Sequence, residues 1–262
     1  MNTPLIPREL ANQSEGPEII AARRKSEPDR ETQWHRHARA QLFATLSGLM
    51  TVRTNAGRWV MPPGRAVWIP PDCRHAVRFH GVIDGWAVYV TPRACGSLPD
   101  TPRVVAISGL LREAICRAAT WSPKSAPLDA RQARIARVIL DELSEAIEEP
   151  LHLPMPRSPG LAKIAHAIAS NPADRRTLDD WARFGNMTKR TLTRRFFAET
   201  GMTVAEWRTR ARLLVALERL VAGEAVTSIA LDLGYESVSA FIAMFRRTFS
   251  TTPKKFLMAD SP

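Results

Sequence analysis

The sequence predicts an α+β protein with two domains: an N-terminal antiparallel β-barrel with following helices, and a C-terminal all-α domain. Three observations support this fold class. Up to about residue 107, apolar residues alternate in short runs that glycine and proline interrupt. From residue 108 onward, apolar residues recur at helical spacing. A proline-rich segment at 149–160 interrupts the helical pattern, which divides the chain into two parts.

The domain boundaries follow from these changes of pattern. Residues 1–107 are expected to form the barrel, and residues 108–148 a helical segment that serves dimerisation. The segment 149–160 carries four prolines, so it cannot continue a helix and is predicted to be a linker. Residues 161–257 are then expected to form the C-terminal domain.

Composition limits the class of protein and its partners. The formal net charge of +11 favours a polyanionic partner, because lysine and arginine side chains release counterions when they bind phosphates. The N-terminus has no apolar stretch behind a basic start, and no apolar run approaches the ~18 residues of a membrane span. The three cysteines have no metal-type spacing and are interpreted as ordinary thiols. We therefore expect a cytoplasmic protein without a membrane partner.

The barrel is expected to consist of short strands separated by turns. Strands are predicted at residues 19–20, 41–45, 49–54, 58–61, 66–70, 76–79, 86–90 and 104–107. Gly48 and the pair Asp84-Gly85 are among the predicted turn residues. Two helices follow, and the segment 121–127 is expected to separate them.

An internal repeat is the most informative feature of the C-terminal part. Thr188, Leu192, Phe196, Thr203 and Trp207 recur 49 residues later as Ser237, Phe241, Phe245, Thr252 and Phe256. Each copy contains a short helix, a turn with a glycine, and a second helix that follows a capping residue. This is the pattern of a helix-turn-helix unit, so the sequence predicts two such units with a long helix between them.

The second helix of the first unit carries residues suited to reading DNA. Because successive residues rotate by about 100°, Arg190 and Arg194 project from the side opposite Leu192 and Phe196. Two arginines one turn apart fit a major groove, where the guanidinium group binds guanine. The DNA-binding residues predicted here are Thr188, Lys189, Arg190, Thr191, Thr193, Arg194 and Arg195, with Lys189 and Arg195 on phosphates.

The corresponding helix of the second unit is basic only in its later turns. Its predicted DNA-binding residues are Ser237, Ser239, Ala243, Arg246 and Arg247. We expect this helix to contact phosphates and thymine methyl groups, while the first unit supplies most of the direct base reading.

The C-terminal part resembles the AraC/XylS family of transcriptional regulators. The resemblance covers residues 161–257 and rests on the stretches 194–203, 207–216, 229–237, 241–246 and 252–256. It implies a regulator without enzymatic activity or catalytic residues, which binds double-stranded promoter DNA and has RNA polymerase as a further candidate partner. It also implies an N-terminal domain that senses a small-molecule effector or mediates dimerisation. The chain departs from the family pattern at Val238, Ile242 and Ala243, where polar or basic residues are more common.

The N-terminal part resembles a cupin barrel, with His35, His37 and Gln41 in one motif and His75 in the other. In cupin enzymes the corresponding positions carry two histidines, a glutamate and a third histidine around a metal. Here Gln41 stands at the glutamate position and is a poorer ligand than a carboxylate. Two interpretations stay open: a divalent metal held by His35, His37 and His75, or a polar pocket that requires no cofactor.

The barrel is expected to hold the effector in a pocket with aromatic walls and few polar groups. The predicted lining residues are Trp34, His35, His37, Gln41, Trp59, Trp68 and His75. The alternative is that the tryptophans belong to the ordinary core of the barrel.

Three functions follow from these patterns. The favoured one is a sequence-specific DNA-binding regulator that responds to a small molecule and forms a homodimer through the helices at 108–148. The second is a cupin-type metal-dependent enzyme with a basic helical tail. The third is a constitutive regulator whose barrel serves only dimerisation.

Overall fold

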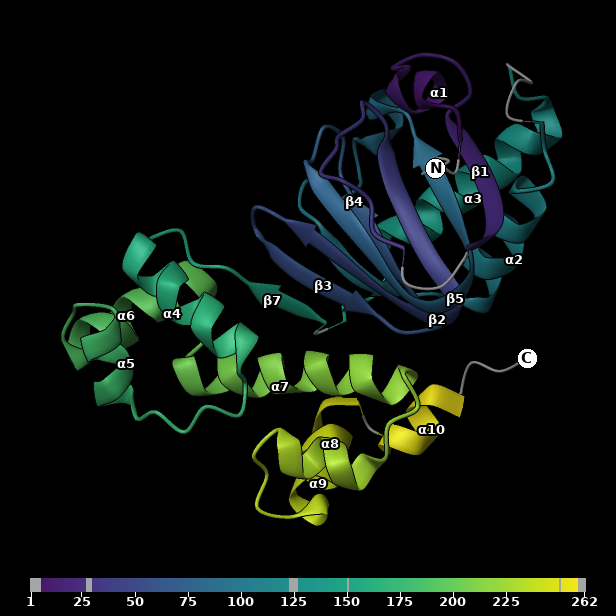
Figure 1. The fold of residues 1–262 in the computed structure, drawn as a ribbon. Coiled ribbons are helices and arrows are strands. Elements are labelled where there is room, and N and C mark those ends of the chain that lie inside the picture. The colour runs from purple at the N-terminus through teal and green to yellow at the C-terminus, as the bar shows by residue number, and fades with distance from the viewer. Residues whose placement is uncertain (1–5, 27–29, 123–126, 150, 250, 259–262) are drawn as a thin grey trace. The chain divides into compact units, whose positions relative to one another are not determined.

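A computed structural model describes residues 6–26, 30–122, 127–149, 151–249 and 251–258 (Figure 1). The chain divides into two compact units. Within the described residues, the first unit contains 6–54 and 59–149, and the second contains 55–58 and 151–258. Of the predicted break at 121–127, residues 123–126 lie outside the described residues. No helix in the described ranges is long and apolar enough to cross a bilayer.

An antiparallel sheet forms the centre of the first unit. Its main path runs β1, β5, β2 and β3, while β4 pairs with β2 and β6 pairs with β4. The strands span β1 Ile19–Ser26, β2 Ala40–Thr54, β3 Gly57–Met61, β4 Arg65–Ile69, β5 His75–Val90 and β6 Arg103–Ala106. Among the described strands β1 and β6 do not pair with each other, so the predicted barrel is an open, curved sheet.

The two longest strands each replace two predicted strands. β2 and β5 pair from Ala40 opposite Val90 to Thr54 opposite His75, with register shifts near Ser47. The turns predicted at Gly48 and Asp84-Gly85 are therefore wrong. Gly48 has a φ of +77°, which suits a bulge, and a Cβ at Gly85 would lie 2.4 Å from the carbonyl oxygen of Ala44. Glycine at these positions lets the strands bend and continue.

Two helices cover one face of this sheet, α2 (Gly109–Ala118) and α3 (Ala130–Ser144) (Figure 1). Ser108 caps α2 by accepting a hydrogen bond from the Leu111 amide, and Asp129 forms a capping box at α3. Leu111 and Ile115 of α2 and Ile139 of α3 pack in one core with the side chains of β1, β2, β4 and β5. The helices at 108–148 thus share the core of the sheet.

The second unit consists of the short strand β7 and seven helices in the described residues. They are β7 His152–Pro154, α4 Pro159–Ser170, α5 Leu178–Phe184, α6 Lys189–Thr200, α7 Val204–Val221, α8 Val226–Asp232, α9 Val238–Phe249 and α10 Pro253–Met258. α4, α5 and α6 gather at one end of α7, and α8, α9 and α10 at the other (Figure 1). Buried apolar side chains along α7, among them Trp207, Leu214 and Leu217, form the core of both clusters.

The segment 149–160 is more ordered than the predicted linker. Leu151 and Leu153 are buried, and Leu153 lies in β7. The indole nitrogen of Trp207 donates a hydrogen bond of 2.7 Å to the carbonyl oxygen of Pro154. The prolines do exclude a helix until Pro159, which begins α4 at a position where its missing amide costs no hydrogen bond.

Candidate DNA-binding surface and effector site

The first helix-turn-helix unit is α5 and α6, joined by a turn at Gly185, Asn186 and Met187. Gly185 is required by close packing, because a Cβ there would lie 2.6 Å from Cδ1 of Ile164 in α4. Asn186 has a φ of +54°, a left-handed conformation that asparagine tolerates better than most residues. This turn sets the direction in which α6 leaves α5.

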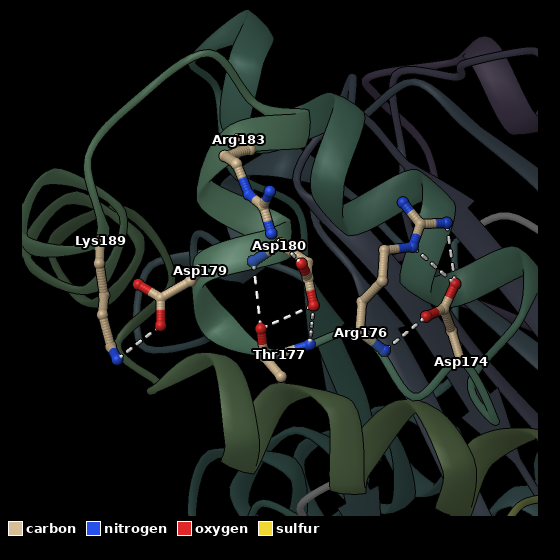
Figure 2. A network of polar contacts seen from close by, with 7 residues as sticks. All are labelled: Asp174, Arg176, Thr177, Asp179, Asp180, Arg183 and Lys189. Carbon is tan, nitrogen blue, oxygen red and sulfur yellow. Dashed lines mark hydrogen bonds and ion pairs between the residues drawn. The ribbon is translucent and has the colours of Figure 1, made fainter.

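A polar network fixes the start of α5 (Figure 2). Thr177 and Asp180 form a reciprocal capping box, and Asp180 also pairs with Arg183. Hydrogen bonds from the Thr177 side chain and backbone lower the pKa of the Asp180 carboxyl. Nearby, Arg176 pairs with Asp174 and lies over the ring of Trp181 at 4.1 Å. Ion pairs therefore stabilise the first helix-turn-helix unit in addition to its apolar core.

Helix α6 presents the two predicted base-reading arginines to solvent. Leu192 and Phe196 are fully buried, while Arg190 and Arg194 are exposed on the opposite face, as the helical period requires. Within the part of the chain that the structure describes, neither arginine makes an ion pair. Thr188 caps the helix by accepting a hydrogen bond from the amide of Thr191. The arginines thus stand near the start of a capped helix.

Other predicted residues of α6 have partners within the protein. The ammonium group of Lys189 lies 3.0 Å from a carboxylate oxygen of Asp179 (Figure 2), and Arg195 donates to the hydroxyl of Ser158 at 2.5 Å. The hydroxyl of Thr193 donates to carbonyl oxygens of its own helix, those of Lys189 and Arg190. These side chains would have to exchange partners to contact phosphates.

The second helix-turn-helix unit is α8 and α9, with Gly234 in the turn at a φ of +76°. Phe241 and Phe245 are buried, while Ser239, Ala243 and Arg246 are exposed, as is Arg247. Ser237 accepts a hydrogen bond from the amide of Ala240, which matches the capping role of Thr188 in the first unit. The exposed face of α9 is therefore uncharged in its first turns and basic in its last.

The N-terminal compact unit contains a cavity of about 750 Å³. This volume is within the usual range of small-molecule sites. Its apolar wall includes Ile6, Phe43, Val77, Phe79 and Ile83, and its polar wall includes His35, His37, Gln41 and Tyr89. Three arginines, Arg8, Arg30 and Arg36, also line it. The space suits a ligand with an apolar body and a polar end.

The backbone brings the histidines together. His35 and His75 exchange two backbone hydrogen bonds of 2.9 Å in an antiparallel bridge, which places them opposite each other. The ring centroid of His37, two residues further along, lies 6.0 Å from that of His35. One ligand atom from each of the three lies within 4.8 Å of the others. Gln41, opposite Tyr89 in the register of β2 and β5, completes the group.

Each imidazole is held by a backbone carbonyl at Nδ1. The distances are 2.9 Å from His35 to Gln33, 2.6 Å from His37 to Arg39 and 2.8 Å from His75 to Cys73. A carbonyl only accepts, so Nδ1 donates in each ring. Burial lowers the pKa of His37 and lowers that of His75 to about 3, which keeps these two rings neutral. The Nε2 atom of His75 has no hydrogen-bond partner among the described residues, whereas Nε2 of His37 lies 3.2 Å from Oε1 of Gln41.

The structure separates the predicted pocket residues into two groups. Trp34, His35, His37 and Gln41 line the cavity, and His75 packs against His35 with ring centroids 4.3 Å apart. Trp68 differs from the prediction because it is paired with Leu42, whose side chain faces α2 and α3, and its indole donates to the Pro99 carbonyl. Trp59 is buried and does not line the cavity either.

The N-terminal segment contributes to the cavity, which the sequence interpretation did not include. Ile6, Arg8, Ala11 and Asn12 line it, and α1 (Arg8–Asn12) lies in this segment. The buried guanidinium of Arg39 attaches the segment by donating to the carbonyl oxygens of Leu10, Glu15 and Pro17. The sequence signal for this contact was Arg39 itself, a charged residue placed directly before the apolar residues of a predicted strand. Tyr89 was hidden because it reads as ordinary strand sequence.

Comparison with known proteins agrees with both units. A model described as an AraC-like ligand binding domain matches residues 19–153, and a model described as a helix-turn-helix domain matches residues 181–259. The HTH-type transcriptional regulator NimR of Escherichia coli (strain K12) is 32% identical over 225 residues, which are 85% of this chain and 81% of NimR. RipA of Corynebacterium glutamicum is 34% identical over 104 residues, 40% of this chain and 31% of RipA.

A crystal structure of ToxT from Vibrio cholerae aligns with 92% of this chain and 98% of that chain, at 11% identity and a TM-score of 0.39. A sheet domain with a cavity, followed by two helix-turn-helix units on one long helix, defines a DNA-binding regulator with a ligand-binding domain. The chain belongs to the AraC-type family of helix-turn-helix transcriptional regulators. The predicted family, fold class and general function are thereby confirmed.

Proposed function

We propose that this regulator selects its promoters mainly through α6 and changes its DNA binding when a small molecule occupies the cavity of the N-terminal unit. The observation that carries the proposal is the pair Arg190 and Arg194, exposed and without ion pairs in the described part of the chain. An arginine in a major groove binds two acceptors of guanine, so each of the two can specify a base pair. Lys189 and Arg195 then serve phosphates.

The second helix-turn-helix unit is assigned a different role in DNA binding. Its α9 offers Ser239 and Ala243 where α6 offers arginines, and its basic residues Arg246 and Arg247 lie in the last turn. We assign to α9 phosphate contacts, with apolar contact to a thymine methyl at Ala243. Two units on one helix can enter successive major grooves about 34 Å apart on one face of the duplex.

The assembly and location follow as parts of the same proposal. Leu110 of α2 and Ile147 after α3 are exposed, with Ile147 at 75%, and these apolar side chains support a homodimer built on this helical face. A regulator of promoters acts on the bacterial chromosome in the cytoplasm, where RNA polymerase is its further partner. No catalytic role is assigned to any residue.

The test is base selection by the full chain. DNA duplexes selected from a random library by the wild-type protein serve as probes for Arg190→Ala and Arg194→Ala. Each variant is expected to bind about 5- to 150-fold more weakly, corresponding to about 1–3 kcal/mol, and to lose preference at one base position. Arg183→Ala, which removes an exposed arginine of α5 that pairs with Asp180, is the matched control. Unchanged selection in both α6 variants would overturn the proposal.

A further inference from the structure

Helix α6 exposes one large aromatic side chain. Phe197 is 56% exposed, whereas its neighbour Phe196 and also Leu192 are fully buried. A single exposed apolar side chain is common on protein surfaces, so its meaning depends on where it lies. The groups that surround Phe197 on the helix surface therefore decide whether it has a role.

Phe197 lies on the same stripe of α6 as the two arginines assigned to base reading. Arg190, Arg194 and Phe197 are all exposed and are spaced i, i+4 and i+7. At about 100° per residue, Phe197 lies within about 20° of Arg190 and about 60° of Arg194 around the helix axis. At about 1.5 Å per residue, it lies about 10 Å from Arg190 along the axis, which is close to three base-pair steps of about 3.4 Å. A helix in a major groove can therefore place the three side chains on neighbouring base pairs.

Thr193, one turn before Phe197, adds a second apolar group beside the arginines. Its hydroxyl donates to the carbonyl oxygens of Lys189 and Arg190, at 3.1 and 3.2 Å. Because the hydroxyl has acceptors in its own helix, the methyl group is the part of Thr193 that remains for an apolar contact. Thr193 is exposed as well. This face of α6 therefore combines two guanidinium groups with an apolar strip.

The internal repeat places Phe197 at a position that faces DNA in the other unit. Its counterpart 49 residues later is Arg246 of α9, an exposed residue to which a phosphate contact is assigned above. Arg190 and Arg194, which make no ion pair among the described residues, attract a polyanion to this face. The apolar group that a major groove offers is the 5-methyl group of thymine, and phenylalanine is among the side chains that contact it.

We propose that Phe197 packs against the 5-methyl group of a thymine in the major groove, and that α6 thereby favours thymine over cytosine at one position of the binding site. The proposal rests on the function proposed above, in which α6 reads the major groove. The contact is separate from the guanine contacts of Arg190 and Arg194. A phenylalanine ring donates no hydrogen bond to a base, so removal of one methyl group from the DNA should remove the contribution of Phe197.

The test compares thymine with deoxyuridine, which lacks only the 5-methyl group, on the full-length protein. Each thymine of the duplexes selected by the wild type is replaced in turn, and binding is measured by fluorescence anisotropy. At one position the replacement should weaken wild-type binding about fourfold, the factor expected for loss of one buried methyl group. Phe197→Ala should bind the thymine duplex at least about fourfold more weakly than the wild type does, and should not distinguish thymine from deoxyuridine at that position.

Two further variants serve as controls. Phe197→Leu keeps an apolar side chain on the stripe, so it should still distinguish the two duplexes. Leu231 of α8 is another exposed apolar residue, at 60%, and lies outside α6, so Leu231→Ala should keep the full wild-type difference. All three variants change exposed side chains and should keep the wild-type circular dichroism and melting temperature.

The proposal is overturned if no deoxyuridine replacement weakens wild-type binding, or if Phe197→Ala keeps the full difference between thymine and deoxyuridine. Wild-type DNA binding by Phe197→Ala, together with weaker binding of RNA polymerase to the complex, would also overturn it, by assigning the ring to a protein interface. These failures leave the proposed function intact as long as Arg190→Ala and Arg194→Ala change base selection. Unchanged selection in those two variants is instead the failure of the proposed function.

Discussion

The two helix-turn-helix units share a core and differ in surface. Phe196 of α6 and Phe245 of α9 occupy equivalent positions in the repeat and are both fully buried. The exposed positions diverge, because Arg190 and Arg194 have as counterparts Ser239 and Ala243. The start of the first helix differs as well: α5 has a capping box, and α8 begins after Ala225 without a side-chain cap. Packing is thus repeated, while the exposed side chains to which we assign DNA contacts differ between the two units.

The largest expected effect tests whether the two cores are equivalent. Phe196→Ala and Phe245→Ala should each lower the free energy of unfolding of the whole C-terminal compact unit by about 3–5 kcal/mol. Each substitution leaves a cavity in a fully buried site. Urea unfolding monitored by circular dichroism measures both. Phe197→Ala is the control, since that ring is 56% exposed and its loss should cost no more than about 0.5 kcal/mol. A difference of several kcal/mol between the first two variants would show that the units are not equivalent.

The second effect concerns how the two surfaces bind DNA. Arg246→Ala should weaken binding to all sequences by a similar factor and reduce the slope of log affinity against log salt by about one, because a phosphate contact releases about one counterion. Arg194→Ala should instead change the preferred base at one position. The measurement is binding by fluorescence anisotropy at several salt concentrations, on selected and on scrambled duplexes. Loss of preference at one base pair in Arg246→Ala would assign base reading to α9.

Much of this comparison follows from the sequence alone. The repeat of 49 residues, with apolar residues four apart, predicts α5, α6, α8 and α9 closely, because local periodicity and capping determine them. The ion pair of Lys189 with Asp179 could not be predicted, since it depends on how α5 and α6 cross. The sheet shows the same dependence on tertiary structure. The sequence predicted the histidines of the cavity, but only the strand register shows that Trp68 faces α2 and α3.

Low pH should affect the capped helix α5 and the uncapped helix α8 differently. The pKa values of Asp180 in the α5 box and of Glu206 in the α7 box are lowered, each by hydrogen bonds from its capping threonine. Their contribution to stability is complete above the unfolded pKa of about 4 and is lost as pH falls through the lower folded pKa. Amide hydrogen exchange should therefore show protection at the start of α5 falling as the pH drops below about 4. Protection at the start of α8 should not change in that step.

The control for this prediction is Asp180→Asn. The amide side chain does not titrate in this range, so the variant should lose the acid-dependent step at α5 while the step at α7 remains. Parallel loss of protection at α5 and α8 in the wild type would mean that the whole unit opens together, and that the caps do not distinguish its two halves.

The smallest effect tests whether α6 is restrained by its own domain. Lys189 and Asp179 form an exposed pair, which is worth no more than about 1 kcal/mol. Asp179→Asn should strengthen DNA binding by less than about fivefold, because it frees Lys189 for a phosphate and removes a negative charge near the duplex. The control introduces Asp179→Asn into the Lys189→Ala variant. If release of the lysine causes the gain in DNA affinity, Asp179→Asn should produce no gain in this variant. A gain that persists without the lysine would mean that the carboxylate acts through its field on the phosphates, and that Lys189 reaches DNA even while it is paired.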